Sequence, residues 1–185
     1  MRAVICLLLL VPSIALADPI ALRAPQVGRA VTIAAGWPAS SIAYQFANGV
    51  GLAAALQLPL NAVSVDVGYK RLWLGEEHGW SMQTAIWGGV LVPLIEPAFA
   101  IDLGLSLHAR LHKSIFVGAF GAAVPAAFKL TNGLQARLPL TADIWLGVEL
   151  GRVQFGVQLA AGATLLATPT PALYLQAALY ASIGF

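Results

Sequence analysis

Three side chains in one short segment carry the groups of a hydrolase. Asp102, Ser106 and His108 supply a carboxylate, a hydroxyl and an imidazole, which could serve as an orienting acid, a nucleophile and a base. Two positions along a strand separate side chains by about 7 Å, so Ser106 and His108 are too far apart for a direct hydrogen bond. We therefore expect His108 to pair with a carboxylate, and a hydrolase stays as an alternative.

Residue types that bind metals occur in two predicted turns. Glu76, Glu77 and His78 are adjacent, and His112 precedes a lysine. Nothing in this spacing fixes the coordination geometry of a zinc site, so we interpret both places as solvated turns. Cys6 is the only cysteine, which excludes disulfides and thiolate metal sites from the rest of the chain. The sequence contains neither a phosphate loop nor a dinucleotide fingerprint, and it predicts no cofactor.

The charged residues are few and lie singly within apolar sequence. Charged residues make up 10% of the chain and hydrophobic residues 59%, whereas about 25% of a typical soluble domain is charged. So few charges cannot cover the surface of a soluble fold of this size, and the excess apolar surface must face lipid. A nucleic-acid partner is not expected, because the basic residues form no cluster.

The apolar residues alternate with small or polar ones, which is the pattern of strands. From Phe99 to Leu111 the odd positions are apolar, while the even positions include Asp102, His108 and Arg110. A helix would place these three charges around its circumference in lipid, where each costs a few kcal/mol, whereas a strand gathers them on one face. The same alternation occurs in the segments 63–70, 143–151 and 153–162.

A helical inner-membrane protein is the alternative fold. The stretch from Ala85 to Leu107 is apolar enough for a membrane helix, but Pro93, Glu96 and Pro97 interrupt it. A helical span needs about 20 consecutive apolar residues. A membrane-spanning barrel, whose strands are about 10 residues long and alternate in polarity, fits the sequence better.

The amino-terminal residues have the pattern of a secretory signal peptide. Arg2 precedes a short apolar run, and Ala15-Leu16-Ala17 forms a small-x-small cleavage site before Asp18. We therefore divide the chain into a signal peptide (1–17), a short periplasmic lead-in (18–28) and a barrel (29–185).

The carboxyl end resembles the last strand of bacterial outer-membrane β-barrel proteins. The odd positions from Leu173 to Phe185 are apolar and end on an aromatic residue. The resemblance is to this class across the mature chain and not to one family. It implies a Gram-negative outer membrane, lipid as the surroundings, and recognition of Phe185 by the barrel assembly machinery. The fold expected is all-β, a small closed antiparallel transmembrane barrel of about ten strands, with eight as the runner-up.

The turns separate ten predicted strands. Short turns at Asn48-Gly49, Gly75–Gly79, His112 and Leu150–Arg152 should lie on the side of the chain ends, and the region Pro125–Gly133 should form a loop on the opposite side. The strands are predicted at 29–37, 41–47, 50–59, 62–74, 79–92, 97–110, 113–124, 134–149, 152–164 and 172–185.

Side-chain parity predicts what fills the barrel and what covers it. We expect ion pairs centred on Arg110, and aromatic rings at Trp87, Trp145, Phe116 and Phe120 inside the barrel. The polar network in the lumen should contain Asp66, Lys70, Asp102, His108, Arg110, Arg137, Asp143 and Glu149. The lipid-facing aromatic belt should contain Trp37, Trp73, Trp80, Phe99 and Phe185. These features predict a non-enzymatic barrel with a filled lumen and a structural or interaction role, with a narrow pore for very small solutes as the alternative.

Overall fold

The structure is a computed structural model, and it describes residues 18–26, 28–58, 62–73, 79–94, 99–131, 133–165 and 172–185. The predicted signal peptide, residues 1–17, lies outside the described residues. Among the described residues, one short helix precedes the strands. The elements are α2 (Ile20–Arg23), β1 (Ala30–Trp37), β2 (Ala39–Gln45), β3 (Val50–Gln57), β4 (Ala62–Leu72), β5 (Trp80–Pro93), β6 (Phe99–Lys113), β7 (Phe116–Thr131), β8 (Gly133–Leu150), β9 (Val153–Leu165) and β10 (Ala172–Gly184).

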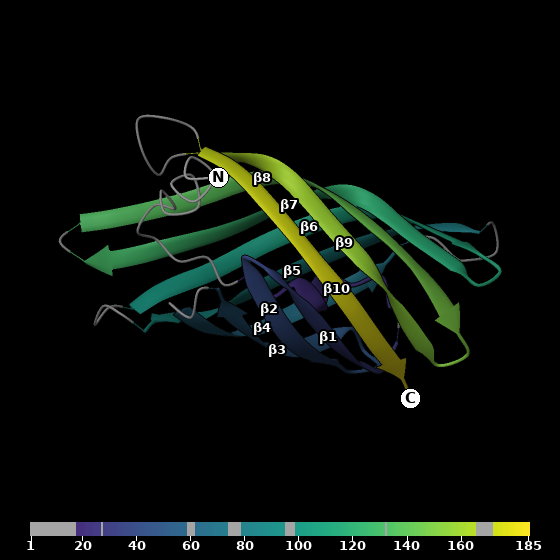
Figure 1. Cartoon of the computed structure of the whole chain (residues 1–185). Coiled ribbons are helices and arrows are strands. Elements are labelled where there is room, and N and C mark those ends of the chain that lie inside the picture. Colours follow the sequence, from purple (N-terminus) through teal and green to yellow (C-terminus); the bar gives the residue numbers. More distant parts are fainter. Residues whose placement is uncertain are drawn as a thin grey trace.

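The ten strands form one closed antiparallel barrel (Figure 1). Each strand pairs with its neighbours in the sequence, and β1 closes the barrel on β10 from Ala30↔Gly184 to Trp37↔Ala177. The mean radius is 10 Å. The predicted fold class is confirmed, with ten strands and not eight.

The predicted alternation decides which side chains face outward. In β6, Leu103 and Leu105 are exposed, while Asp102, Ser106 and His108 are buried. The apolar stretch that suggested a membrane helix lies in β5 and β6, so the helical alternative is wrong. No helix in the described ranges is long and apolar enough to cross a membrane.

Tight turns join the strands at the rim that carries the carboxyl end. Gly49 has φ 88° and Gly151 has φ 64°, conformations that favour glycine. The Asn48 side-chain oxygen accepts a hydrogen bond from the backbone N–H of Val50, at 3.1 Å. The predicted turn at His112 is displaced, because β6 continues to Lys113 and the turn lies at Ser114–Ile115. Most of the predicted turn at 75–79 lies outside the described residues.

Residues 125–131 continue strand β7 and Gly133 begins β8, so the prediction of a loop over Pro125–Gly133 is wrong. The strand β7 pairs with β6 from Lys113↔Phe116 to Phe99↔Leu130. Proline explains the error. A proline has no N–H to donate to a ladder, and the pairing of β7 with β8 is interrupted at Pro125 and Pro139, between Ala123↔Thr141 and Ala127↔Arg137.

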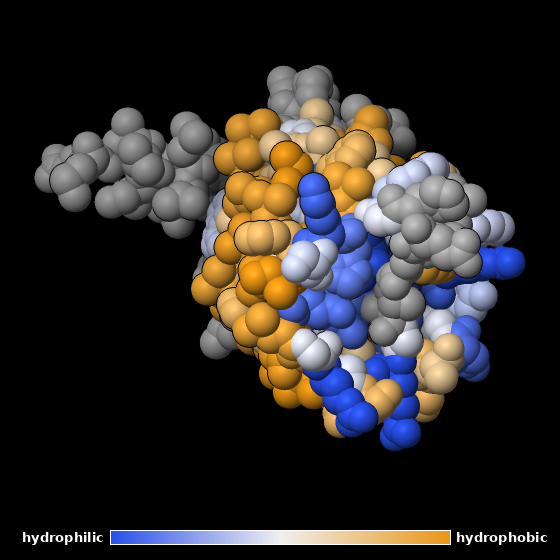
Figure 2. Space-filling model, turned by 90° about the vertical axis from the view of Figure 1, so that its right-hand side faces the viewer, coloured by the Kyte–Doolittle hydropathy of each residue, from blue (hydrophilic) through white to orange (hydrophobic). Residues whose placement is uncertain are grey.

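The segment expected as a lead-in packs inside the barrel. The helix α2 lies among the strands in Figure 1, and its four residues are between 0% and 7% exposed. Asp18 and Ala24, which flank the helix, are fully buried as well. Figure 2 looks onto the right-hand end of Figure 1 and shows hydrophilic residues gathered at this end beside the apolar wall.

Candidate functional site in the barrel lumen

Residues 18–26, named here the plug segment, occupy the centre of the lumen. The helix is a single turn, because proline flanks it on both sides. Pro19 precedes the first helical residue, a position where its missing N–H is not needed. Pro25 forces the residue before it into an extended conformation, and Ala24 accordingly has ψ 146°. The sequence therefore makes a short, compact insert in place of a longer helix.

Arg23 is the centre of the buried polar contacts. Its guanidinium donates hydrogen bonds to the carboxylates of Asp18 and Asp143 and to Gln176 Oε1, the last at 3.1 Å. The same guanidinium lies 5.6 Å from the ring centroid of Trp87. The side chains of Arg23, Asp18 and Asp143 are all 0% exposed. These charge-assisted contacts tie the plug segment to β8, β10 and β5.

The wall also binds the backbone of the plug segment. Lys70 Nζ donates to the Ala24 carbonyl at 2.9 Å, and Gln83 Nε2 donates to the Arg23 carbonyl at 3.1 Å. The N–H of Ala21 donates to Ser41 Oγ at 2.8 Å. Carbonyls at the end of a helix have no partner within the helix. The strands thus supply the partners that a one-turn helix lacks.

Small residues on three short strands make room for the plug segment. Ala34 of β1, Ala43 of β2 and Ala53 of β3 belong to the same buried apolar cluster as Ile20 and Leu22. Larger side chains facing inward at these positions would occupy the space of the helix. The composition of β1–β3 therefore fits a barrel that contains this segment.

Some of the predicted lumen residues contact the plug segment, and others contact residues of the barrel wall. Arg110 lies 3.8 Å from Glu149, but the centre of the network is Arg23, which parity along the strands could not include. Asp66 accepts a hydrogen bond from Ser64 Oγ at 2.6 Å. Of the remaining predicted members, Lys70, Asp102, His108, Arg137 and Asp143 are all buried.

The possible hydrolase residues are not arranged as a catalytic group. His108 Nε2 lies 3.3 Å from Asp143 Oδ2, so the histidine contacts a carboxylate, as expected, but on β8. Ser106 Oγ has no hydrogen-bond partner among the described residues. The nucleophile and base of a hydrolase need a direct hydrogen bond. The described part of the chain also holds no group of three metal-binding side chains, and Glu76, Glu77 and His78 lie outside it.

Two of the four aromatic rings expected inside the barrel face outward. Trp87 and Trp145 are buried, but Phe116 is 64% and Phe120 56% exposed. The strand β7 turns its small residues inward, and at Gly121 a Cβ would lie 1.9 Å from the Leu107 carbonyl oxygen. Phe116 and Phe120 thus take the outward positions of β7, whose inward residues Val117, Ala119 and Ala123 are buried.

Exposed aromatic side chains surround the rim that carries the carboxyl end. Trp73, Trp80 and Phe185 lie there, on the outer surface, and Trp37 lies on the outer surface near the opposite rim. The side chain of Phe99 lies outside the described residues. The rim that carries the carboxyl end also has the exposed aromatic residues Phe46, Tyr69, Phe116 and Phe155.

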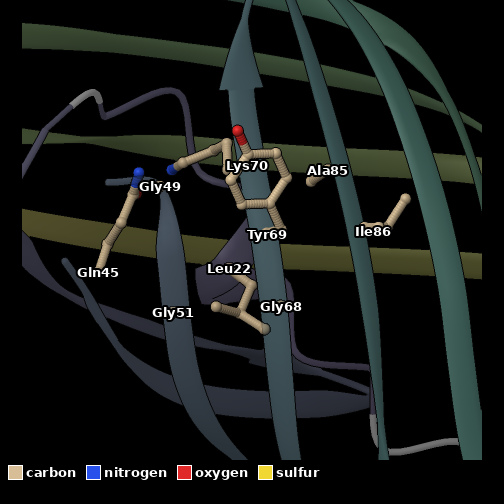
Figure 3. Close-up of a pocket in the computed structure, with 9 residues that line it drawn as sticks. All are labelled: Leu22, Gln45, Gly49, Gly51, Gly68, Tyr69, Lys70, Ala85 and Ile86. Carbon is tan, nitrogen blue, oxygen red and sulfur yellow. The ribbon is translucent and has the colours of Figure 1, made fainter. Parts of the chain in front are cut away.

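A small pocket with a volume of about 10 Å³, room for about one water molecule, lies between the plug segment and β2–β5 (Figure 3). Leu22 and Lys70 line it together with glycines of β3 and β4. Ligand sites usually have about 300–1,000 Å³, so this pocket is too small for an ordinary organic ligand. The lumen is therefore a packed interior more than a binding cavity.

Trp87 packs across the adjacent strand onto Gly104. The two residues are directly paired, and a Cβ on Gly104 would lie 2.1 Å from the indole ring. Gly104→Ala should therefore lower the free energy of unfolding in detergent by about 1–3 kcal/mol, the usual cost of overpacking. Gly118→Ala is the matched control, because its nearest atom would lie 3.7 Å away. Equal effects of the two substitutions, measured by urea titration, would contradict this packing.

Comparison with known proteins finds no matching family model, no matching curated protein and no matching solved structure. A functional argument for this chain therefore rests on its own geometry. Two features carry that argument, the apolar outer surface and the filled lumen.

Proposed function

We propose that this protein is an outer-membrane β-barrel with a closed lumen and a structural or interaction role. In this proposal the chain is exported by a signal peptide of residues 1–17, and the assembly machinery recognises the last strand and Phe185. The observation that carries the proposal is a closed barrel with apolar side chains outside and a buried ion-pair network inside.

The outer surface supports a lipid environment. Large apolar side chains project from the middle of the strands, and Leu105, Leu146 and Leu179 are between 55% and 66% exposed. Apolar patches above a few hundred Å² are rare on soluble monomers and mark interaction surfaces. Aromatic residues at the rims match the girdles of transmembrane barrels.

The filled lumen supports the proposal of a closed barrel and argues against an open channel. A helix with its side chains is about 10–12 Å across, so even one turn fills much of a barrel with a mean radius of 10 Å. Clear aqueous channels occur in barrels of about 16–18 strands. The wall also binds both the charged side chain and the carbonyls of the plug segment. We therefore infer that the barrel does not conduct freely and performs no catalysis.

An arginine on the middle of the outer surface tests the membrane environment. Leu105→Arg should destabilise the barrel in lipid vesicles by about 2–4 kcal/mol, because the charge lies near the bilayer midplane, whereas Leu111→Arg, near the rim, should cost about 0–1 kcal/mol. The two leucines share one strand and one face and are 55% and 50% exposed. The measurement is denaturant unfolding in vesicles. Equal effects at both positions would contradict a transmembrane barrel.

A further inference from the structure

Asp102 is a carboxyl group buried in the wall of the lumen, and it forms no direct contact with a cation among the described residues. It is 0% exposed, and neither of its oxygens has a side-chain hydrogen-bond partner in that part of the chain. An isolated ionised carboxylate is very costly to bury. A second carboxylate, Asp66, is also 0% exposed, and its Oδ1 has no side-chain partner either.

The two carboxylates flank a glycine on three adjacent strands. Asp66 of β4 pairs with Gly89 of β5, and Gly89 pairs with Asp102 of β6. A Cβ on Gly89 would lie 2.3 Å from Asp66 Oδ1. Gly89 therefore leaves no room for a side chain, and Asp66 Oδ1 lies against its backbone between the two strands. Together the two acids have three oxygens without a side-chain partner among the described residues.

The first residue of the plug segment lies near both acids. The Asp18 carboxylate is close enough to Asp66 and Asp102 to repel both. Asp18 thus lies within electrostatic range of three buried acids, Asp66, Asp102 and Asp143. Arg23 contacts the carboxylates of Asp18 and Asp143 directly, and it acts on Asp102 only from a longer distance.

We propose that the α-ammonium group of a chain that begins at Asp18 binds Asp102 and Asp66 and locks the plug segment in the lumen. The inference rests on the proposed export of the protein. Hydrolysis of the Ala17–Asp18 peptide bond consumes one water, leaves a carboxylate on Ala17, and leaves an amine on Asp18 that takes up a proton. An ammonium group has three N–H donors, and these match the three carboxylate oxygens. The uncleaved amide has one donor and no charge.

The position of the amino terminus tests this lock. Two chains are refolded in detergent, one that begins at Asp18 and one that begins at Ala17 and so displaces its ammonium by one residue. In the first chain Asp102→Asn should lower the folding equilibrium constant about tenfold or more, the usual effect of losing a hydrogen bond to a charged group. In the second chain the same substitution should have little effect or should stabilise. Glu149→Gln is the matched control, because its partner Arg110 lies 3.8 Å away on the wall, and it should act equally in both chains.

Chemical reactivity of the amine gives a second readout. The α-amine of the first chain should react with an acylating reagent at least tenfold more slowly than in the unfolded chain, and Asp102→Asn should restore part of the rate. Trypsin releases the peptide from Asp18 to Arg23, so mass spectrometry measures this rate directly.

Three outcomes would overturn the lock. Equal effects of Asp102→Asn in both chains would mean that Asp102 is neutral or bound elsewhere. Stability that rises with added Ca²⁺ or K⁺, whatever the first residue, would mean that a soluble cation binds the two acids. An α-amine that reacts as fast as in the unfolded chain would place it in water. A folded barrel that gives any of these results leaves the proposed membrane role intact, since the arginine substitutions on the outer surface test that role separately.

Discussion

A chain that lacks residues 18–26 should conduct ions across a planar lipid bilayer, whereas a chain that begins at Asp18 should be electrically silent. The plug segment fills part of the lumen that the side chains of the strands leave open, and its helix residues belong to the inner apolar cluster. Its removal would leave Asp143, Lys70 and Gln83 without the partners that they have in the plug segment. Water can solvate these groups only by entering the lumen.

The measurement is single-channel recording of the two purified proteins in the same bilayer. Discrete conductance steps are expected from the shortened chain, and circular dichroism should show that it still forms strands. The result that would refute the prediction is a folded but silent shortened barrel. It would mean that Trp87, Trp145 and the other inward side chains close the lumen without the plug segment.

The barrel itself could be predicted because a strand places alternate side chains on opposite faces. Residues 99–111 and 173–185 keep this period without a break, and an apolar outer face with a polar inner face makes the two sides of each strand chemically distinct. Turns followed from local rules where glycine was present, as at Asn48-Gly49. The predictions failed where a local signal conflicted with pairing. Pro125 suggested a loop, because proline cannot donate a hydrogen bond to a ladder. The strand β7 nevertheless continues through Pro125, because it pairs with β6 there, and only its pairing with β8 is interrupted.

The centre of the site could not be predicted by the same reasoning. Arg23 contacts Asp143, which is 120 residues away in the sequence, and it lies in a segment with no strand period. Parity along strands says nothing of a side chain that reaches the wall from inside. One signal was available, since Asp18 and Arg23 enclose an apolar Ile-Ala-Leu sequence, a composition better suited to a buried insert than to a solvated lead-in. The prediction of inward phenylalanines failed because the opposite parity of β7 faces inward, where Ala119 and Ala123 are buried.

Replacement of Arg23 by alanine should cost about 3–5 kcal/mol of the free energy of unfolding, the range for breaking a buried ion pair. The substitution leaves the carboxylates of Asp18 and Asp143 at 0% exposure without their guanidinium. It also removes the contact with the Trp87 ring at 5.6 Å. The plug segment can relieve the two charges only by leaving the lumen, so the same variant should show intermittent conductance.

A second substitution separates the loss of the Arg23–Asp143 contact from the cost of burying an unpaired carboxylate. Asp143→Asn in the Arg23→Ala background should recover part of the stability, because it removes one of the uncompensated carboxylates, whereas Asp143→Asn alone should destabilise. Contacting residues of this kind show coupling energies of about 0.5–3 kcal/mol in such cycles. Arg152→Ala is the control, since Arg152 is exposed in the turn between β8 and β9, and it should change stability by less than about 0.5 kcal/mol. Additive effects of the two substitutions, measured by denaturant titration in detergent, would show that Arg23 and Asp143 do not depend on each other. The plug segment would then be held mainly by the apolar contacts of Ile20 and Leu22, and loss of its charge would leave the lumen closed.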